Sequence, residues 1–183
     1  MELPDDHLVR MAQRDPADFV HLYDRYLDQV YRYCRRRLPT EQAEDATSIT
    51  FLNALRAIGT MDPVRSGFRA WLFTIAHNAL IDQTRDRRHD PIDGLALPDR
   101  SPTPDEHIET IDGRWQLDRA IATLPPDQQT VVSLRLAGLT GPEIAEVAGK
   151  SHEAVRGLQF RAINRLRRQM TDPAASTRQD RES

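Results

Sequence analysis

The sequence predicts an all-α protein made of two small helical domains, an N-terminal helical bundle and a C-terminal helix-turn-helix domain, joined by a flexible linker. Apolar residues recur at intervals of three and four along most of the 183 residues, which is the helical period. No segment shows the strict alternation of a half-buried strand. Residues 89–113 contain four prolines and a surplus of acidic residues, a composition typical of a linker.

Residues 1–88 are predicted to form the first domain. A short helix is expected near Asp6–Gln13. A second helix follows Asp15, whose side chain can cap it, and has Pro16 in its first turn. We expect the apolar face of this second helix to consist of Phe19, Leu22, Tyr23, Tyr26, Leu27, Val30, Tyr31 and Cys34.

Two further helices complete this domain. Thr40 is predicted to cap the first of them, which ends at Gly59. We expect its apolar face to consist of Phe51, Leu52, Leu55 and Ile58. The other helix runs from Phe68 to Arg88, after a loop over residues 60–67. Its predicted buried residues are Phe68, Trp71, Leu72, Ile75, Ala76 and Ala79.

Residues 114–170 are predicted to form the second domain, and residues 171–183 a polar, disordered tail. Its first helix begins at Arg114 and reaches Leu124. The next opens at Pro125 and ends at Gly138. The segment that follows, Leu139–Arg168, has the pattern of a helix-turn-helix motif.

Characteristic residues mark both helix starts and the turn of this motif. Thr140 and Glu143 have the spacing of a capping box. Gly149 fits a left-handed C-terminal cap, and Ser151 can cap the second helix. We expect a shared core of Ile144, Val147, Val155, Leu158, Ala162 and Leu166. The second helix turns arginines outward, as a helix in a DNA major groove does, although an ordinary αα-hairpin with a basic surface is the alternative.

Composition excludes several classes of protein. No apolar run approaches the length of a membrane span and the N-terminus lacks a secretory signal, which predicts no membrane insertion. Cys34 is the single cysteine, so an internal disulfide is impossible; we expect a packed thiol and a cytoplasmic location. The six histidines show no metal-ligand spacing and no glycine-rich phosphate loop occurs. We therefore expect no metal, no cofactor and no enzyme.

The charge is unevenly distributed along the chain. The net charge is −3, yet basic residues cluster at 35–37, 85–88 and 156–168. Local field matters more than the total for phosphate attraction, so DNA remains a candidate partner. The near-neutral total argues against tight DNA binding by the chain alone, and it indicates a protein that reaches DNA together with another.

The last helix of the first domain carries a polar stripe opposite its predicted core. Asn78, Asp82 and Arg85 are spaced i, i+4 and i+7. Asparagine suits base edges, and arginine suits phosphates or guanine. A solvated helix face is the alternative. Trp71 lies on the core stripe, which favours packing over base stacking, whereas both roles stay open for Phe73.

Together these segments resemble the sigma-70 family of bacterial RNA polymerase sigma factors, specifically the small extracytoplasmic-function (ECF) group. Residues 43–55, AEDATSITFLNAL, are similar to the family's polymerase-binding helix. Residues 68–89, FRAWLFTIAHNALIDQTRDRRH, are similar to its strand-melting and −10-element helix. Residues 124–167 resemble its −35-reading domain. The resemblance implies a promoter-specificity subunit that binds core RNA polymerase and promoter DNA and opens the strands by capturing unstacked bases. It also implies a possible anti-sigma partner.

Individual roles follow from the resemblance alone. The surface that docks on the polymerase would include Asp45, Ser48 and Ile49. The loop 61–67 would form, together with Asn78, a pocket for a flipped base of the −10 strand. Asp82 and Arg85 would flank that strand. The residues that would face the −35 groove or its phosphates are His152, Glu153, Arg156 and Arg161.

The sequence also departs from the family's pattern. Ser48 and Ile49 stand where the family usually has glutamine and an acid, and Ala154 where threonine is frequent. Gly157 within a helix costs about 1 kcal/mol of helix stability relative to alanine. Because glycine has no side chain, we expect this position to allow a close approach of the backbone to DNA. A stand-alone helix-turn-helix regulator is the alternative function; it would bind duplex DNA tightly without polymerase.

Overall fold

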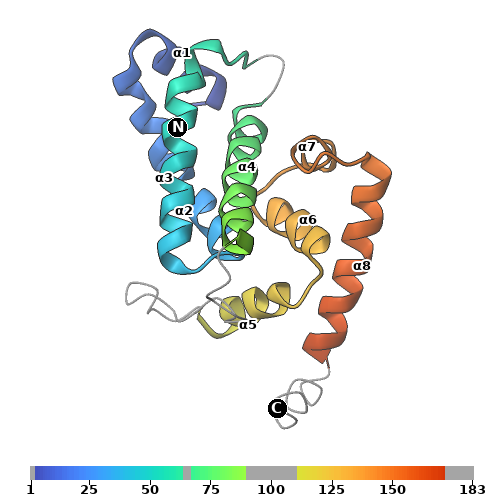
Figure 1. The fold of residues 1–183 in the computed structure, drawn as a ribbon. Coiled ribbons are helices and arrows are strands. Elements are labelled where there is room, and N and C mark those ends of the chain that lie inside the picture. The colour runs from blue at the N-terminus through green and yellow to red at the C-terminus, as the bar shows by residue number, and fades with distance from the viewer. Residues whose placement is uncertain (1–2, 64–66, 90–110, 172–183) are drawn as a thin grey trace.

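The computed structural model describes residues 3–63, 67–89 and 111–171. Within these ranges the chain forms eight α-helices and two short 3-10 turns, without a β-strand. Figure 1 shows the N-terminal helices gathered on one side and the C-terminal helices on the other. The predicted all-α class with two helical domains is confirmed. Most of the predicted linker and tail, residues 90–110 and 172–183, lies outside the described residues.

The N-terminal domain follows the predicted order of helices. It consists of α1 (Asp5–Arg14), the turn η1 (Pro16–Asp18), α2 (Phe19–Arg35), α3 (Thr40–Ala57), the turn η2 (Ile58–Thr60) and α4 (Phe68–His89). Asp15 is a cap, as predicted, because its carboxylate accepts the Ala17 N–H at 2.9 Å. The predicted cap at Thr40 is wrong by one position. Pro39 occupies the cap, and its carbonyl accepts the first backbone hydrogen bond of α3.

The core of this domain contains most of the predicted residues and adds two aromatic rings. Tyr33, which the predicted face of α2 omits, and Phe73 are fully buried and meet edge to face with centroids 5.5 Å apart. Phe73 is therefore a core residue. Trp71 is half-buried, with its ring 5.6 Å from Phe68, so it packs as predicted. Cys34 is buried, and burial raises the pKa of its thiol to about 12, which confirms a packed thiol.

The predicted apolar face of α3 is wrong in part. Leu52 and Leu55 are 47% and 39% exposed. The buried stripe instead consists of Ala43, Ala46, Thr47, Thr50, Phe51 and Ala54. The two threonines tolerate burial because each hydroxyl donates to the carbonyl four residues earlier, at 2.6 Å. Apart from Phe51, the helix thus packs through small side chains, and it leaves Leu52 and Leu55 outside.

The C-terminal domain contains the predicted helix-turn-helix. Its helices are α5 (Ile111–Ala122), α6 (Pro126–Leu136), α7 (Gly141–Val147) and α8 (His152–Thr171), and α5 begins three residues earlier than predicted. Glu143 accepts hydrogen bonds from both the N–H and the hydroxyl of Thr140, at 2.6 Å each. Gly149 has a φ of +61°, and the Ser151 hydroxyl oxygen accepts the Ala154 N–H at 3.1 Å. All six predicted core residues of the motif are buried.

The two domains pack directly on each other. Helix α7 lies against α4, and Figure 1 shows them side by side. Buried residues of the C-terminal domain continue the hydrophobic core of the N-terminal domain; they are Val131, Leu134, Ala137, Leu139, Ile144, Val147, Val155 and Leu158. The sequence carries no local signal for this contact, because residues far apart in the chain make it.

Three arginines of the N-terminal domain bind the C-terminal domain. Arg36 donates to the Asp118 carboxylate at 2.9 Å, and Arg37 donates to the Thr130 hydroxyl oxygen at 2.9 Å. Arg69 donates to the Gly138 carbonyl at 3.3 Å. In the first of these pairs the Arg36 side chain is mostly buried, at 13% exposure, whereas the Asp118 side chain is 40% exposed. None of the helices in the described ranges is both long and apolar enough to cross a membrane.

Candidate nucleic-acid interface

Helix α4 presents the predicted polar stripe to solvent. The side chains of Asn78, Asp82 and Arg85 are all exposed. They lie on the side of the helix opposite Leu72 and Ala76, which are fully buried. Trp71, seven residues before Asn78, is half-buried against Phe68 and lies at the border between this stripe and the core. The structure thus brings the three predicted side chains to one accessible face.

The predicted pocket for a flipped base falls partly outside the described residues. Residues 64–66 of the loop 61–67 are not described. Of the rest, Met61 is buried and Gly67 is exposed. A joint pocket of this loop with Asn78 therefore stays a prediction.

Next to the stripe, His77 has a structural role. Its Nδ1 lies 2.8 Å from the Tyr33 hydroxyl oxygen, and the imidazole is half-buried. Burial, followed by the positive charges of Arg37 and Lys150, lowers the pKa of His77 below its ordinary value. Because Lys150 belongs to the C-terminal domain, the packing of the domains contributes to this shift.

Helix α8 exposes every residue predicted to face the −35 element. These residues are His152, Glu153, Arg156 and Arg161. With 3.6 residues per turn, Glu153 and Arg156 lie on the outward side, opposite the buried Val155, Leu158 and Ala162. His152 and Arg161 lie on its two flanks. Figure 1 shows α8 along the edge of the molecule, away from the N-terminal helices.

The sequence reasoning missed other residues on this outward side of α8. Phe160 is 69% exposed, and it follows Arg156 by four residues. Asn164 and Arg167 continue the same line at the next turns. The i, i+4 spacing from Arg156 is the signal that could have found them.

A second accessible face lies on α3, and we call it the α3 face. Asp45, Ser48 and Ile49 are exposed on it, as the resemblance implied. Leu52 and Leu55 continue the same line. A contiguous set of large apolar side chains beside a carboxylate is typical of a protein interaction surface.

A hollow of about 450 Å³ between α2 and α3 adjoins the α3 face. Its apolar lining includes Tyr23, Tyr31 and Phe51, and Ser48 belongs to the lining as well. The acidic lining residues are Asp24, Asp28 and Glu44. This combination suits a partner that offers apolar and basic side chains.

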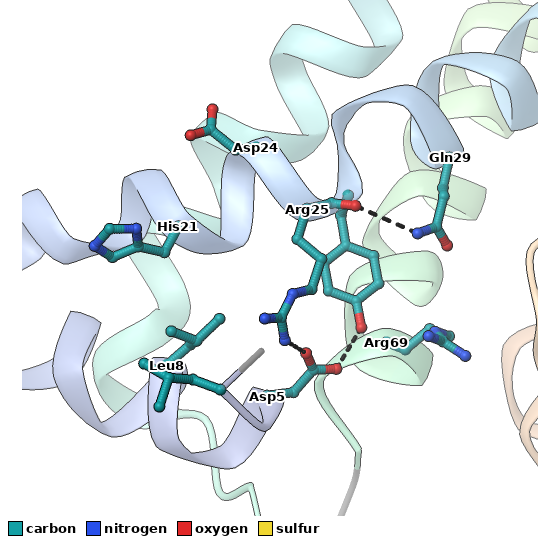
Figure 2. A pocket seen from close by; sticks show the side chains of 9 residues that line it. Asp5, Leu8, His21, Asp24, Arg25, Gln29 and Arg69 are labelled. Carbon is teal, nitrogen blue, oxygen red and sulfur yellow. Dashed lines mark hydrogen bonds and ion pairs between the residues drawn. The ribbon is translucent and has the colours of Figure 1, made fainter. Parts of the chain in front are cut away.

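A larger pocket, of about 650 Å³, opens among α1, α2 and α4 (Figure 2). Asp5 accepts hydrogen bonds from Arg25, at 2.7 Å, and from the Tyr26 hydroxyl. Burial, then the hydrogen bond to Asp5, raises the pKa of Tyr26 to about 12. These groups bind one another across α1 and α2, so they fasten α1 to the domain. Over the described ranges, histidine, cysteine and acidic side chains form no group that could hold a metal ion.

The fold and the site define a two-domain helical protein with a DNA-directed helix-turn-helix. Residues 22–89 match the family described as Sigma-70 region 2, and residues 120–168 match Sigma-70 region 4. The chain belongs to the sigma-70 family of RNA polymerase sigma factors, within the ECF group to which its similar curated proteins are assigned.

Two curated relatives illustrate the similarity. The chain is 42% identical over 177 residues to ECF RNA polymerase sigma factor BldN of Streptomyces coelicolor, covering 91% of this chain and 66% of BldN. It is 30% identical over 161 residues to ECF RNA polymerase sigma factor RpoE of Cereibacter sphaeroides, covering 86% and 89% of the two chains.

Two solved structures share the fold. CnrH in complex with the cytosolic domain of CnrY has a TM-score of 0.66 and 26% identity, over 98% of this chain and 99% of that one. The sigma factor RpoE in complex with the anti-sigma factor NepR, from Bartonella quintana, has a TM-score of 0.73 and 22% identity. That match covers 84% of this chain and 97% of the other. At this identity the second likeness concerns the fold alone.

Proposed function

We propose that this chain is a promoter-specificity subunit of RNA polymerase. It binds core RNA polymerase, recognises −10 and −35 promoter elements, and supports strand opening to initiate transcription. The observation that carries the proposal is the presence of both sigma-70 segments in one chain, in residues 22–89 and 120–168. The protein then works in the cytoplasm, where its polymerase is, and has no catalytic activity of its own.

The −35 element is assigned to α8. His152, Glu153, Arg156 and Arg161 are its proposed DNA-binding residues, and all are accessible. A recognition helix reads the major groove through its N-terminal turns, which is where these residues lie. The basic side chains bind phosphates or guanine, and Glu153 can accept from a cytosine amino group.

The −10 element is assigned to the stripe on α4. Asn78 can bind base edges, and Arg85 is suited to the backbone phosphates of the separated strand. Asp82 lies between them on the same face. Extruding a base costs a few kcal/mol, so these contacts must offset that cost for the strands to open.

Core RNA polymerase is assigned to the α3 face. Asp45, Ser48 and Ile49 are its proposed contact residues, and the exposed Leu52 and Leu55 enlarge the apolar part of the same surface. Burying these leucines against the polymerase removes apolar area from water, which drives most protein association. Ser48 and Ile49 stand on this face where the family usually has glutamine and an acid, and Ile49 adds apolar surface there.

An anti-sigma protein is the proposed regulatory partner. CnrH, 26% identical over nearly the whole chain, was solved with the cytosolic domain of CnrY. We propose that a comparable protein holds both domains of this chain off the polymerase. Co-purification of a small protein with this chain, and its displacement by core polymerase, would support the proposal.

Reconstituted transcription tests the main proposal. The purified chain is added to active core polymerase with a template that contains the region upstream of its own gene. We expect run-off transcripts from a defined start, and co-purification of the chain with the core. Absence of such transcripts, with core that is active with another sigma factor, would count against it. Tight, sequence-specific binding of duplex DNA by the chain alone would instead favour a stand-alone regulator.

A further inference from the structure

His77 lies where the two domains meet. Its imidazole is half-buried on α4, and its Nδ1 is 2.8 Å from the hydroxyl oxygen of the fully buried Tyr33. Helix α7 of the C-terminal domain packs against α4 (Figure 1), and Lys150 belongs to the turn that follows α7. Histidine is the side chain whose charge changes most readily near neutral pH. The contact between the domains therefore contains a group that responds to a moderate change of pH.

Two cationic side chains face His77, one from each domain. Burial lowers the pKa of His77 most, and the positive charges of Arg37 and then Lys150 lower it further. Arg37 belongs to the same domain as His77, so it stays near the imidazole whatever the C-terminal domain does. Lys150 is near it only while the domains are packed together. Separation of the domains therefore removes one positive charge from the surroundings of His77.

The packed arrangement holds both cations in place through α6. Arg37 donates to the Thr130 hydroxyl oxygen at 2.9 Å, and Lys150 donates to the Asp127 carboxylate at 3.0 Å. The Asp127 side chain is 62% exposed, so water screens its charge and it offsets Lys150 only in part. The surroundings of His77 are thus positive on balance.

The acidic groups on the other elements around α4 lie elsewhere. The side of α3 that enters the core carries no charged residue. On α7, Glu143 lies beside Gly67, ten residues before His77 and about 15 Å from it along the helix, and Glu146 is exposed. Asp5 of α1 is bound to an arginine of α2. The residues of α4 three and four positions from His77 are uncharged; they are Phe73, Thr74, Leu80 and Ile81. A proton on His77 would therefore add a third positive charge at a place that these carboxylates do not reach.

The hydrogen bond to Tyr33 also opposes protonation. The unprotonated Nδ1 of a neutral His77 can accept from the Tyr33 hydroxyl. In the imidazolium both ring nitrogens are donors, so the buried hydroxyl loses this acceptor, which is unfavourable. This local cost arises in the packed and the separated arrangement alike, because both residues belong to one domain. Repulsion from Lys150 arises in the packed arrangement alone.

We propose that His77 is a pH-sensitive switch for the contact between the two domains. Protonation of its imidazole adds a positive charge next to Arg37 and Lys150, and the repulsion moves the C-terminal domain away from α4. A proton shifts an equilibrium toward the arrangement that binds it more tightly, which is the one without Lys150 nearby. Acidification would thus increase the fraction of chains with separated domains. The switch would operate in the free chain, whatever that chain binds.

Energy transfer between two dyes measures the separation of the domains in the full chain. The dyes are attached to cysteines introduced by Val20→Cys in α2 and Met170→Cys in α8, whose native side chains are 49% and 59% exposed. The native Cys34 is buried, so it does not compete for the dyes. We expect the transfer efficiency to fall reversibly as the pH is lowered from about 7.5 to about 5.5, across the range in which histidine titrates. Circular dichroism of the same samples should show an unchanged helical signal.

Three variants of the labelled chain identify the cause. His77→Gln should abolish the response to pH, because glutamine offers Tyr33 an acceptor but does not titrate. Lys150→Met should weaken the response, because it removes the cation that only the packed arrangement brings to His77. His21→Gln is the matched control; it replaces an exposed histidine of the same domain and should keep the full response.

Four results would overturn the proposal. The first is a transfer efficiency of wild type that is equal at both pH values. The second is an equal response in wild type and His77→Gln. A full response in Lys150→Met is the third, since repulsion from that side chain would then not drive the separation. The fourth is a fall in transfer that accompanies a loss of helical signal, which would indicate unfolding.

Discussion

Replacing Ile49 and Leu52 by glutamine should separate polymerase binding from folding. Both side chains lie on the α3 face and are 42% and 47% exposed. Glutamine keeps the side-chain length and a good helix propensity while removing the apolar surface. The fold should change little, because substitutions at exposed positions usually alter stability by about 0.5 kcal/mol or less.

The magnitude follows from the exposed fractions. Burying a whole leucine or isoleucine side chain is worth about 1.5–3 kcal/mol. Nearly half of each side chain is still in contact with water, so its burial against polymerase contributes about 0.7–1.4 kcal/mol. Losing both contributions raises the dissociation constant for core polymerase by roughly 10- to 100-fold.

Competition for core polymerase measures this effect. A fluorescently labelled wild-type chain is displaced by the unlabelled double variant, and thermal melts of the two chains are compared. Leu3→Gln, at 46% exposure and distant from this face along the chain, is the matched control and should compete like wild type. Unchanged affinity of the double variant would refute the assignment of this face. A large loss of thermal stability would show that these residues support the fold.

Three further predictions concern α4 and α8. The stability of the variant His77→Gln should depend less on pH than that of wild type. The pKa of His77 is lowered in the folded protein, so the unfolded chain binds the proton more readily. Wild type therefore loses stability as the pH falls below 6.5. Denaturant melts at about pH 7.5 and about pH 5.5 check this, and equal losses in both chains would contradict it. Asn78→Ala should lower start-specific transcription by roughly 5- to 150-fold, the range for one good base contact, with an unchanged melting temperature. A normal transcript level would remove Asn78 from the interface. Gly157→Ala should stabilise α8 by about 0.5–1 kcal/mol, since the added methyl meets only the end of the flexible Arg161 side chain, at 3.3 Å. It should also reduce promoter binding, and undiminished binding would show that close approach of the backbone is unnecessary.

The helix-turn-helix could be predicted from the sequence because local interactions specify it. Thr140, Glu143, Gly149 and Ser151 act within one turn of their own positions, so their roles follow from spacing. The polar stripe around Asn78 follows from helical period in the same way. These features need no knowledge of the rest of the chain.

Other features depend on contacts that spacing does not contain. Spacing alone assigns the buried face of α3 to its large apolar residues. In the structure the side with small residues enters the core, because the hydroxyls of Thr47 and Thr50 donate to backbone carbonyls of the same helix. Spacing leaves open whether Phe73 belongs to the core, because its burial depends on the ring of Tyr33, which comes from another helix. The pairing of Arg36 with Asp118 spans 82 positions of the chain, beyond the reach of any periodic pattern.

The continuous core has a practical consequence for work with fragments. A piece of the chain that contains only the helix-turn-helix would leave Leu139, Ile144 and Val147 without some of the neighbours they have in the intact protein. The newly wetted patch would favour self-association. Affinity measured on such a truncation would describe a stickier and less stable molecule, so the uncut polypeptide is the proper reagent for promoter studies.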